Sequence, residues 1–330
     1  MIISIDFRVF VTSKLTEEGL TRLKKYCKVC IHTADSPITQ EELLKFAPLL
    51  DAIIPVGTKI NAKFIEKAKK LKIISNYGVG YDNIDVTAAT KKGIPVTNLP
   101  YSVTESTAEL TISLMLAVSR RIIEADNYVR TINDGNWYPT LLMGHELYAK
   151  KLGIIGFGRI GQTVAKCACG FGMDIYYYDI KHQDSDELGK NVKYLPFSEL
   201  IKQMDYITLH VPYLKETHHL IAEKEFENMK KSAYLINTSR GPVVDQQALI
   251  KALKDKIIAG AALDVFETEP QVPVELCNLK NVVLTPHIGT STVETRIKMA
   301  IRASEKVIQI MKGETPENVI NEKELKRRKK

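Results

Sequence analysis

Two side chains that could carry acid–base and anion-binding chemistry each follow an apolar run in the second half of the chain. His287 stands in "LTPHIGTST" and Arg240 in "LINTSRGPVVD". A histidine can give or take a proton because it titrates near neutrality. The arginine is either a solvated turn residue or a fork that binds a carboxylate through two hydrogen bonds. Together they would suit hydride transfer to a carbonyl, which needs a proton donor and a cation that orients the substrate.

Three carboxylates in "ALDVFETEP" could complete such a site. Asp264 ends an apolar run, and Glu267 and Glu269 follow it. Spacing alone does not decide which glutamate pairs with a histidine. His287 is preferred, as the one histidine with a plausible carboxylate partner, because ligands bind at the carboxyl ends of strands in open α/β sheets. His210 is expected along a cofactor crevice, without a charged partner. The other histidines are expected at the surface: His32, His145, His182, His218 and His219.

The segment "GIIGFGRIG" predicts a dinucleotide site rather than only a tight turn. Its glycines are Gly156, Gly158 and Gly161. The first allows the turn, the second lets a pyrophosphate approach, and the third lets helix and sheet pack closely. The helix N-terminus then offers amides to the phosphates. Asp179, which ends the next apolar run, would bind both ribose hydroxyls and repel a 2′-phosphate, so we expect NAD; Lys181 and His182 leave NADP open.

The elements that must position these residues alternate regularly along the chain. Short apolar runs separated by amphipathic stretches are typical of parallel βαβ units. The expected strands are residues 9–11, 52–55, 73–75, 152–155, 175–178, 206–211, 234–237, 259–263 and 282–285. The expected shorter helices are residues 17–26, 62–70, 198–204 and 246–253. The fold class is therefore α/β with doubly wound parallel sheets.

Two longer helices are expected at residues 105–133 and 292–311, the first capped by Thr104 or Ser106. The piece after the second helix is too short to fold alone. We therefore predict a discontinuous, flavodoxin-like substrate domain, residues 1–100 plus 291–330. A Rossmann-type NAD-binding domain, residues 101–290, is inserted in it, and the two long helices form the hinge.

Composition is that of an ordinary globular protein, with 330 residues, enough for two domains. The formal net charge of +7 arises partly from the tail "KELKRRKK", residues 323–330. This tail is expected to be solvated and frayed, and no aromatic residues interleave with its charges as a nucleic-acid contact would favour. We therefore expect no nucleic-acid partner.

The five cysteines are expected to be reduced structural thiols, with no metal. Cys27-x-x-Cys30 has no second cysteine pair or spaced histidine pair to complete a metal site. No targeting segment is visible, and the most apolar window, residues 110–118, is far shorter than the ~20 residues that span a bilayer. We expect a cytoplasmic protein without a membrane partner.

The motifs "GFGRIG" with Asp179, "TSRGPVVD", "ALDVFETEP" and "TPHIGTST" occur together and in this order. The chain resembles, over nearly its whole length, the D-isomer-specific 2-hydroxyacid dehydrogenase family. The resemblance implies that Arg240 binds the substrate carboxylate and carbonyl oxygen. His287 would donate a proton to that oxygen as hydride arrives from NADH. The family's glutamate falls on Glu269 rather than Glu267, where it would orient His287 and favour its protonated form.

The resemblance also assigns binding residues. Val79 and Gly80, in "NYGVGYDNID", would hold the substrate carboxylate through their amides. Other residues expected to line the cofactor crevice are Arg159, Ile160, Val211, Pro212, Thr217, Thr238, Ser239, Asp264 and Gly289. The family forms homodimers through the cofactor domain, so residues 127–146, with Trp137, are a candidate dimer arm.

The substrate is expected to be a small 2-keto acid such as glyoxylate or hydroxypyruvate. The carboxylate of Glu269 argues against formate, and the Gly78-Val79-Gly80 loop differs from that of D-lactate enzymes. A phosphoglycerate dehydrogenase without a regulatory domain is the alternative; no arginine lies near Pro55, although Lys59 could substitute. A non-catalytic, NAD-sensing corepressor of the same fold is the rival class, and the long extra termini of such proteins are not seen.

Overall fold

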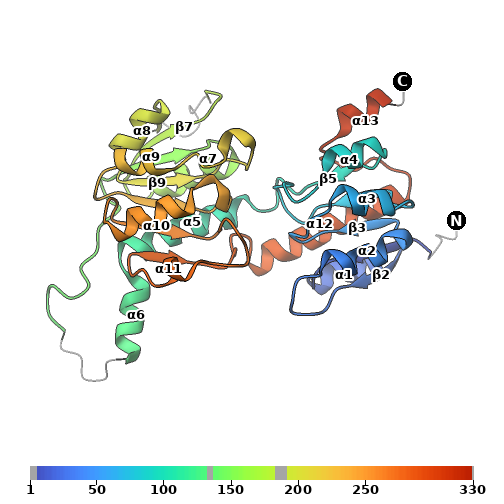
Figure 1. The fold of residues 1–330 in the computed structure, drawn as a ribbon, viewed down its shortest axis with the longest axis horizontal. Helices are drawn as coiled ribbons and strands as arrows, with labels where there is room; N and C mark the ends of the chain where they lie inside the picture. The colour runs from blue at the N-terminus through green and yellow to red at the C-terminus, as the bar shows by residue number, and fades with distance from the viewer. Residues whose placement is uncertain (1–5, 132–136, 183–191, 329–330) are drawn as a thin grey trace. The chain divides into compact units, whose positions relative to one another are not determined.

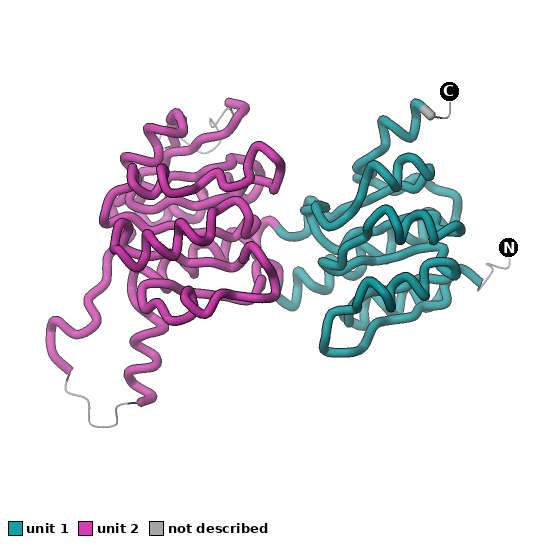
Figure 2. The backbone as a smooth tube through the Cα atoms, in the orientation of Figure 1, with its two compact units in different colours: residues 1–103, 291–330 teal, residues 104–290 magenta. Residues whose placement is uncertain are grey.

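The computed structural model describes residues 6–131, 137–182 and 192–328 and divides the chain into two compact units. Unit 1 comprises residues 1–103 and 291–330, and unit 2 comprises residues 104–290 (Figure 2). The sequence placed the first boundary at residue 100 rather than 103. Each unit is a parallel sheet covered by helices (Figure 1).

Unit 1 is built on a five-stranded parallel sheet in the order β2-β1-β3-β4-β5, the flavodoxin-like order. Its strands are β1 Arg8–Val11, β2 Lys28–Ile31, β3 Ala52–Ile54, β4 Ile73–Ser75 and β5 Val96–Thr97. Its helices are α1 Glu17–Lys24, α2 Gln40–Phe46, α3 Ala62–Lys67, α4 Val86–Lys91, α12 Val293–Met311 and α13 Glu322–Arg328, with the 3₁₀ turn η1 Ala47–Leu49. The β1 residues alternate in side-chain direction, so Phe10 joins the core under α2, α3 and α4.

Helix α12 packs along α1, and Gly19 makes this close crossing possible. A Cβ at Gly19 would lie 2.5 Å from the Ala300 carbonyl carbon, so any larger residue would push the helices apart. The N-terminus of α12 is capped by Thr292, whose side chain accepts a hydrogen bond from Thr295 N. The predicted helix 292–311 is confirmed, with Thr292 as its cap.

Unit 2 is built on a seven-stranded parallel sheet in the order β12-β11-β10-β9-β6-β7-β8. Its strands are β6 Lys151–Ile155, β7 Asp174–Tyr178, β8 Val192–Tyr194, β9 Tyr206–Leu209, β10 Tyr234–Asn237, β11 Gly260–Leu263 and β12 Val282–Leu284. Its helices are α5 Thr104–Ser119, α6 Ile122–Thr131, α7 Arg159–Cys169, α8 Phe197–Gln203, α9 Glu223–Asn228, α10 Gln246–Lys254 and α11 Val274–Cys277, with 3₁₀ turns η3 Lys215–Thr217 and η4 Gly241–Val243. The first strand, β6, lies between β7 and β9, which is the Rossmann arrangement. The predicted fold class is confirmed.

The predicted helix at residues 105–133 is wrong as one element, because two helices, α5 and α6, replace it. Arg121 has a φ of 54°, which breaks the helical run. In a continuous helix the Ser119 carbonyl would accept from the amide four residues on; instead it accepts from His145 N at 2.8 Å. The returning chain thus ends α5 at Ser119. Helix α5 also begins at Thr104, so the expected cap is itself the first helical residue.

The expectation of a frayed tail is also wrong, because residues 322–328 form α13. Asn321, which is 2% exposed and directly precedes this helix, connects it to the rest of unit 1. Its Oδ1 accepts a hydrogen bond from Val96 N, and its Nδ2 donates to Thr90 Oγ1 and Ile94 O. Residues 329 and 330 lie outside the described part of the chain.

Strands β5 and β8, of two and three residues, were not predicted from the sequence. Strand β2 alternates exposed and half-buried positions. The five cysteines form no disulfide in the structure; Cys27 is buried, and Cys30 and Cys277 are exposed. Within the described ranges no group of three potential metal ligands occurs, and no helix there is long and apolar enough to cross a membrane.

Candidate active site

The predicted chemical residues of unit 2 follow the carboxyl ends of neighbouring parallel strands. Arg240 follows β10, Glu269 follows β11 and His287 follows β12, while the glycine turn follows β6. Strand order reverses between β6 and β9, and open α/β sheets bind ligands outside such a switch point. The fold therefore brings the predicted cofactor turn and the predicted acid–base residues to one edge of one sheet.

The glycine turn has the shape that a dinucleotide requires. Gly156 has a φ of 91°, and a Cβ there would lie 2.7 Å from the His210 carbonyl carbon. A Cβ at Gly161 would overlap the carbonyl oxygen of Gly156, so only glycine lets α7 pack this closely on the turn. At Gly158, by contrast, a Cβ would meet no protein atom within 4 Å. The space over Gly158 is open, as it must be for a pyrophosphate to approach the backbone at the start of α7.

Asp179 lies beside this turn, immediately after β7. Its Oδ2 accepts a hydrogen bond from Phe157 N at 2.8 Å, and its Oδ1 accepts from Lys181 N at 3.1 Å. The carboxylate is thus fixed by backbone amides on both oxygens while each oxygen retains a further lone pair. These residues fit a dinucleotide whose ribose hydroxyls donate to Asp179.

His287 and Glu269 form a hydrogen-bonded pair, with Nδ1 of the histidine 2.8 Å from Oε2 of the glutamate. Glu269 Oε1 accepts a second hydrogen bond from Phe266 N at 3.0 Å. His287 has a φ of 54°, and its amide donates to Asp264 O and Thr285 O. Nε2 of His287 has no partner among the described residues, so this nitrogen is the one left to exchange a proton with a substrate.

Arg240 contributes its charge to this pair. Burial raises the pKa of Glu269, but the hydrogen bond and charge of His287, the Phe266 amide and the Arg240 charge outweigh burial and lower the pKa overall. Glu269 therefore stays ionised at neutral pH. Arg240 itself donates from Nη1 to Ser239 O at 2.8 Å, and its own carbonyl accepts from Asn237 Nδ2. The predicted arginine, glutamate and histidine are thus brought together.

Asp264 fixes the turn that carries His287. It is 1% exposed, and its Oδ1 accepts from Thr285 Oγ1 and Ile288 N, while its Oδ2 accepts from Gly289 N. This network explains how a histidine can sit in a left-handed conformation after β12. The assignment of Asp264 and Gly289 to the cofactor stays a prediction.

The remaining predicted crevice residues lie at the same edge of the sheet. Thr217 Oγ1 donates to Pro212 O at 2.7 Å and accepts from Leu214 N at 2.8 Å, which shapes the loop after β9. Thr238 Oγ1 lies 2.9 Å from Thr111 Oγ1. The other predicted residues are placed as follows: Ser239 donates to Asn237 Oδ1, Val211 packs on the core under α8, α9 and α10, Ile160 packs on the core under α5 and α7, and Arg159 begins α7.

The predicted substrate loop belongs to unit 1. The carbonyl of Val79 accepts from Asn98 Nδ2 at 2.8 Å, and that of Gly80 accepts from Asn76 Nδ2 at 2.7 Å. Neither amide of these two residues has an acceptor among the described residues. The loop is therefore held by its carbonyls with its amides available to a carboxylate.

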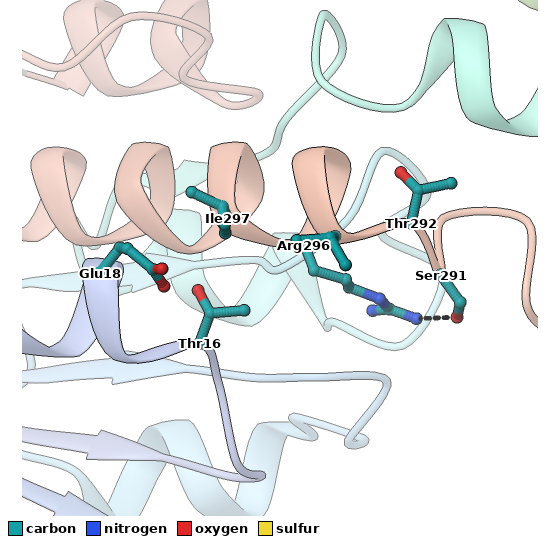
Figure 3. Close-up of a pocket in the computed structure, with 7 residues that line it drawn as sticks. Thr16, Glu18, Ser291, Thr292, Arg296 and Ile297 are labelled. Carbon is teal, nitrogen blue, oxygen red and sulfur yellow. Dashed lines mark hydrogen bonds between the residues drawn. The ribbon is translucent and has the colours of Figure 1, made fainter.

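A separate hollow of about 380 Å³ in unit 1 contains none of the predicted site residues (Figure 3). It lies at the start of α12, where the Arg296 guanidinium donates to Ser291 Oγ at 2.9 Å. Thr16, Glu18, Thr292, Val293 and Ile297 complete its lining. Because its one arginine is hydrogen-bonded and Glu18 of α1 also lines the hollow, we assign it no role in the chemistry.

Sequence reasoning missed a second histidine–carboxylate pair. His219 Nε2 lies 2.5 Å from Glu267 Oε1, and His219 Nδ1 lies 3.8 Å from Asp245 Oδ2. His287 was predicted to be the one histidine with a carboxylate partner, so that expectation is wrong. The competition between Glu267 and Glu269, seen from spacing alone, was the available signal: each glutamate pairs with a different histidine.

Comparisons with known proteins identify the family of the chain. Residues 112–289 match the family model of the D-isomer specific 2-hydroxyacid dehydrogenase, NAD binding domain. A glyoxylate reductase of Thermococcus litoralis is 47% identical over 319 residues, covering 95% of this chain and 96% of its own.

Two solved structures are similar over almost the whole chain. The TT0316 protein of Thermus thermophilus has a TM-score of 0.90 at 39% identity, covering 95% of this chain and 100% of its own. An NADPH-dependent glyoxylate/hydroxypyruvate reductase of Sinorhizobium meliloti, solved with NADP and malonate, has a TM-score of 0.80 at 30% identity, covering 92% and 93%. Family match, fold and glycine turn together identify an NAD(P)-binding oxidoreductase that acts on CH–OH groups, and the chain belongs to the D-isomer-specific 2-hydroxyacid dehydrogenase family.

Proposed function

We propose that this protein reduces a small 2-keto acid, glyoxylate or hydroxypyruvate, to its D-2-hydroxy acid with NADH. The observation that carries the proposal is the His287–Glu269 pair, 2.8 Å apart, under the charge of Arg240 and at the sheet edge that holds the glycine turn. The relatives from Thermococcus litoralis and Sinorhizobium meliloti, both described as reductases of such acids, support the substrate class.

In the proposed reaction each residue has one task. The bound nicotinamide supplies the hydride. Arg240 binds the carboxylate and the carbonyl oxygen and stabilises the negative charge that develops there. His287 donates a proton from Nε2 to that oxygen, and Glu269 holds the ring through Nδ1 and favours imidazolium before transfer. We assign the amides of Val79 and Gly80 to the substrate carboxylate.

The proposed preference for NADH rests on Asp179. Its carboxylate is fixed by two backbone amides and would meet a 2′-phosphate as a like charge. The Sinorhizobium meliloti relative is NADPH-dependent, so the preference needs its own test. Lys181 or His182 would contact a 2′-phosphate if NADPH were used instead.

A panel of 2-keto acids, with NADH and NADPH in parallel, tests the proposal. We expect highest kcat/KM with glyoxylate or hydroxypyruvate and NADH, and little with 3-phosphohydroxypyruvate. The Asp179→Ala variant should swing the NADH/NADPH ratio of kcat/KM toward NADPH by ~1–3 kcal/mol, the usual scale for a lost hydrogen bond to a charged group. Turnover of no 2-keto acid would favour an NAD-sensing binding protein; a wild type that prefers NADPH would overturn the cofactor assignment.

We further propose a homodimer formed through unit 2. Helix α6 has no buried residue, and large apolar side chains are exposed on it and after it. They are Ile122, Ile123, Val129, Trp137, Tyr138, Met143 and Tyr148. Trp137 is 82% exposed, and so large an apolar surface marks an interaction site. Residues 132–136 of the predicted arm lie outside the described residues. The molecular mass in solution tests the proposal.

We also propose a cytoplasmic protein without a nucleic-acid partner.

A further inference from the structure

The second histidine–carboxylate pair is tied to the loop that carries Glu269. His219 follows η3 and joins Glu267 Oε1 through Nε2, while its other ring nitrogen faces Asp245 Oδ2. Glu267 stands only two residues before Glu269. The side chains of His219 and Glu267 are 36% and 24% exposed, so the pair is more buried than His287 and Glu269, at 49% and 34%.

The backbone around the pair is held in an uncommon conformation. His219 has a φ of 50°, a region that residues other than glycine seldom adopt. Its amide donates to Pro242 O at 2.9 Å, so the same residue is tied to the turn after Arg240. Left-handed residues of this kind cluster where the surrounding structure must fix a functional geometry.

The turn after Arg240 is packed directly on the loop of Glu267. A Cβ at Gly241 would overlap the carbonyl group of Phe266, so the two backbones touch. Glu267 N donates to Gln246 Oε1 at 3.4 Å, and Phe266 N holds Glu269. Three segments therefore meet at one pair: the loop after β9, the Arg240 turn and the loop of Glu269.

Asp245 completes this arrangement from helix α10. Its Oδ1 caps the helix by accepting from Gln247 N and Ala248 N, and this leaves Oδ2 facing His219. His219 is thus hydrogen-bonded to one carboxylate through Nε2, and Nδ1 lies within ion-pair range of a second carboxylate, so the ring stands between two negative charges. Its place suits holding the loops rather than exchanging a proton.

We propose that His219 and Glu267 are positioning residues that hold residues 266–269 so that the Glu269 carboxylate stays on His287. The proposal rests on the proposed function, since it assigns His287 as the proton donor. Loss of the pair lets the Glu269 loop shift, and proton donation slows while the dinucleotide keeps its contacts at the glycine turn after β6 and at Asp179 after β7.

The test uses Glu267→Gln in the full-length protein, alone and combined with Glu269→Gln. Misplacement of a catalytic group by about 1 Å can cost 10²-fold, so we expect kcat with glyoxylate to fall about tenfold or more. The KM for NADH should stay within twofold. In the Glu269→Gln background the same change should cost less than twofold, because the group being positioned is already gone. Equal losses in both backgrounds would overturn the proposal.

The matched control is Glu223→Gln, which makes the same change in an exposed ion pair with Lys251, also in unit 2. It should leave kcat unchanged. His219→Gln keeps a donor near the Nε2 position and should retain most activity, whereas His219→Leu should lose as much as Glu267→Gln. If Glu267→Gln unfolds, the kcat of His219→Gln is compared with that of His219→Leu instead. Equal kcat in these two variants would overturn the proposal.

A second readout does not depend on turnover. The pH titration of the His287 ring, followed by NMR and identified by its loss in His287→Gln, should shift toward lower pH in Glu267→Gln and leave Glu223→Gln unchanged. A wild type without 2-keto acid turnover would defeat the proposed function, yet this shift would still support the positioning pair. An unmoved His287 titration in Glu267→Gln would overturn the pair whatever the activity.

Discussion

The described part of unit 2 contains two histidine–carboxylate pairs of similar composition and different surroundings. His287 meets Glu269 through Nδ1, and His219 meets Glu267 through Nε2. Both histidines have a left-handed backbone, with φ of 54° and 50°. The difference lies in the second ring nitrogen, which is unpartnered in the described structure at His287 and faces the Asp245 carboxylate at His219. A carboxylate partner alone therefore does not make a histidine a proton donor. The histidine also needs a second ring nitrogen that a substrate can reach.

The charges around the two pairs also differ. The positive charge of Arg240 acts on Glu269 and helps to lower its pKa, so the proposed catalytic pair has beside it a cation that a substrate carboxylate could share. Asp245 adds a negative charge beside His219, and its other oxygen is committed to the cap of α10. The first pair suits a site that binds an anion, and the second suits a structural clasp.

The largest effect that would test the comparison is loss of His287. His287→Gln should lower kcat by ~10²–10⁴-fold, the usual contribution of general acid catalysis, while NADH binding is nearly intact. His219→Gln, the same change in the other pair, should keep most of the activity. Steady-state kinetics and titration of NADH fluorescence measure both. A His287→Gln enzyme within threefold of wild type would show that the donor lies elsewhere.

The second prediction concerns the carboxylate of the catalytic pair and the pH profile. Reduction needs the donor protonated at the start, so kcat/KM should fall as pH rises through the titration of the pair. The interaction that lowers the pKa of Glu269 must by linkage favour imidazolium at its partner. Glu269→Gln removes this charge, and the falling limb should move to lower pH. A limb that stays in place would mean that Glu269 orients the ring without tuning it.

The sequence predicted the elements that depend on apolar periodicity and the residues that motifs mark. Strand β6, the glycine turn and Asp179 were predicted because each follows from spacing along one βαβ unit. The pair of His287 with Glu269 needed the family resemblance, because Glu267 was equally well spaced.

What the sequence could not predict depends on contacts between distant segments. The end of α5 at Ser119 is made by His145 N, and the order of α13 depends on Asn321 reaching Val96. His219 and Glu267 are 48 residues apart and join through loops that carry no periodic signal. Such long-range pairings are set by tertiary packing rather than by local pattern.

A third histidine of unit 2, His210, directly follows β9 and extends the comparison, because no hydrogen bond joins its ring to a carboxylate among the described residues. Its Nε2 is buried without a hydrogen-bond partner in the described structure, and burial lowers the pKa of the ring from 6.5 to about 3. The ring is therefore neutral when folded and takes up a proton below pH 6.5 when unfolded. Because the folded pKa is depressed, the stability that this neutrality contributes is present above pH 6.5 and is lost as pH falls toward 3. Between pH 7 and pH 5.5 the wild type should lose about 1 kcal/mol of unfolding free energy through this group.

His210→Gln removes the titrating ring, so its free energy of unfolding should fall less steeply over the same interval, whatever its stability at pH 7. Urea unfolding at pH 7, 6.5, 6 and 5.5 gives the two slopes. His145→Gln, the loss of an exposed imidazole from the same unit, is the control for the substitution itself. The three histidines then separate by chemistry: removal of His287 should appear in turnover, removal of His219 in the coupling to Glu269, and removal of His210 in acid stability alone. Parallel slopes in wild type and His210→Gln would show that the buried ring finds a proton-accepting partner, and the distinction between paired and unpaired histidines would fail at this position.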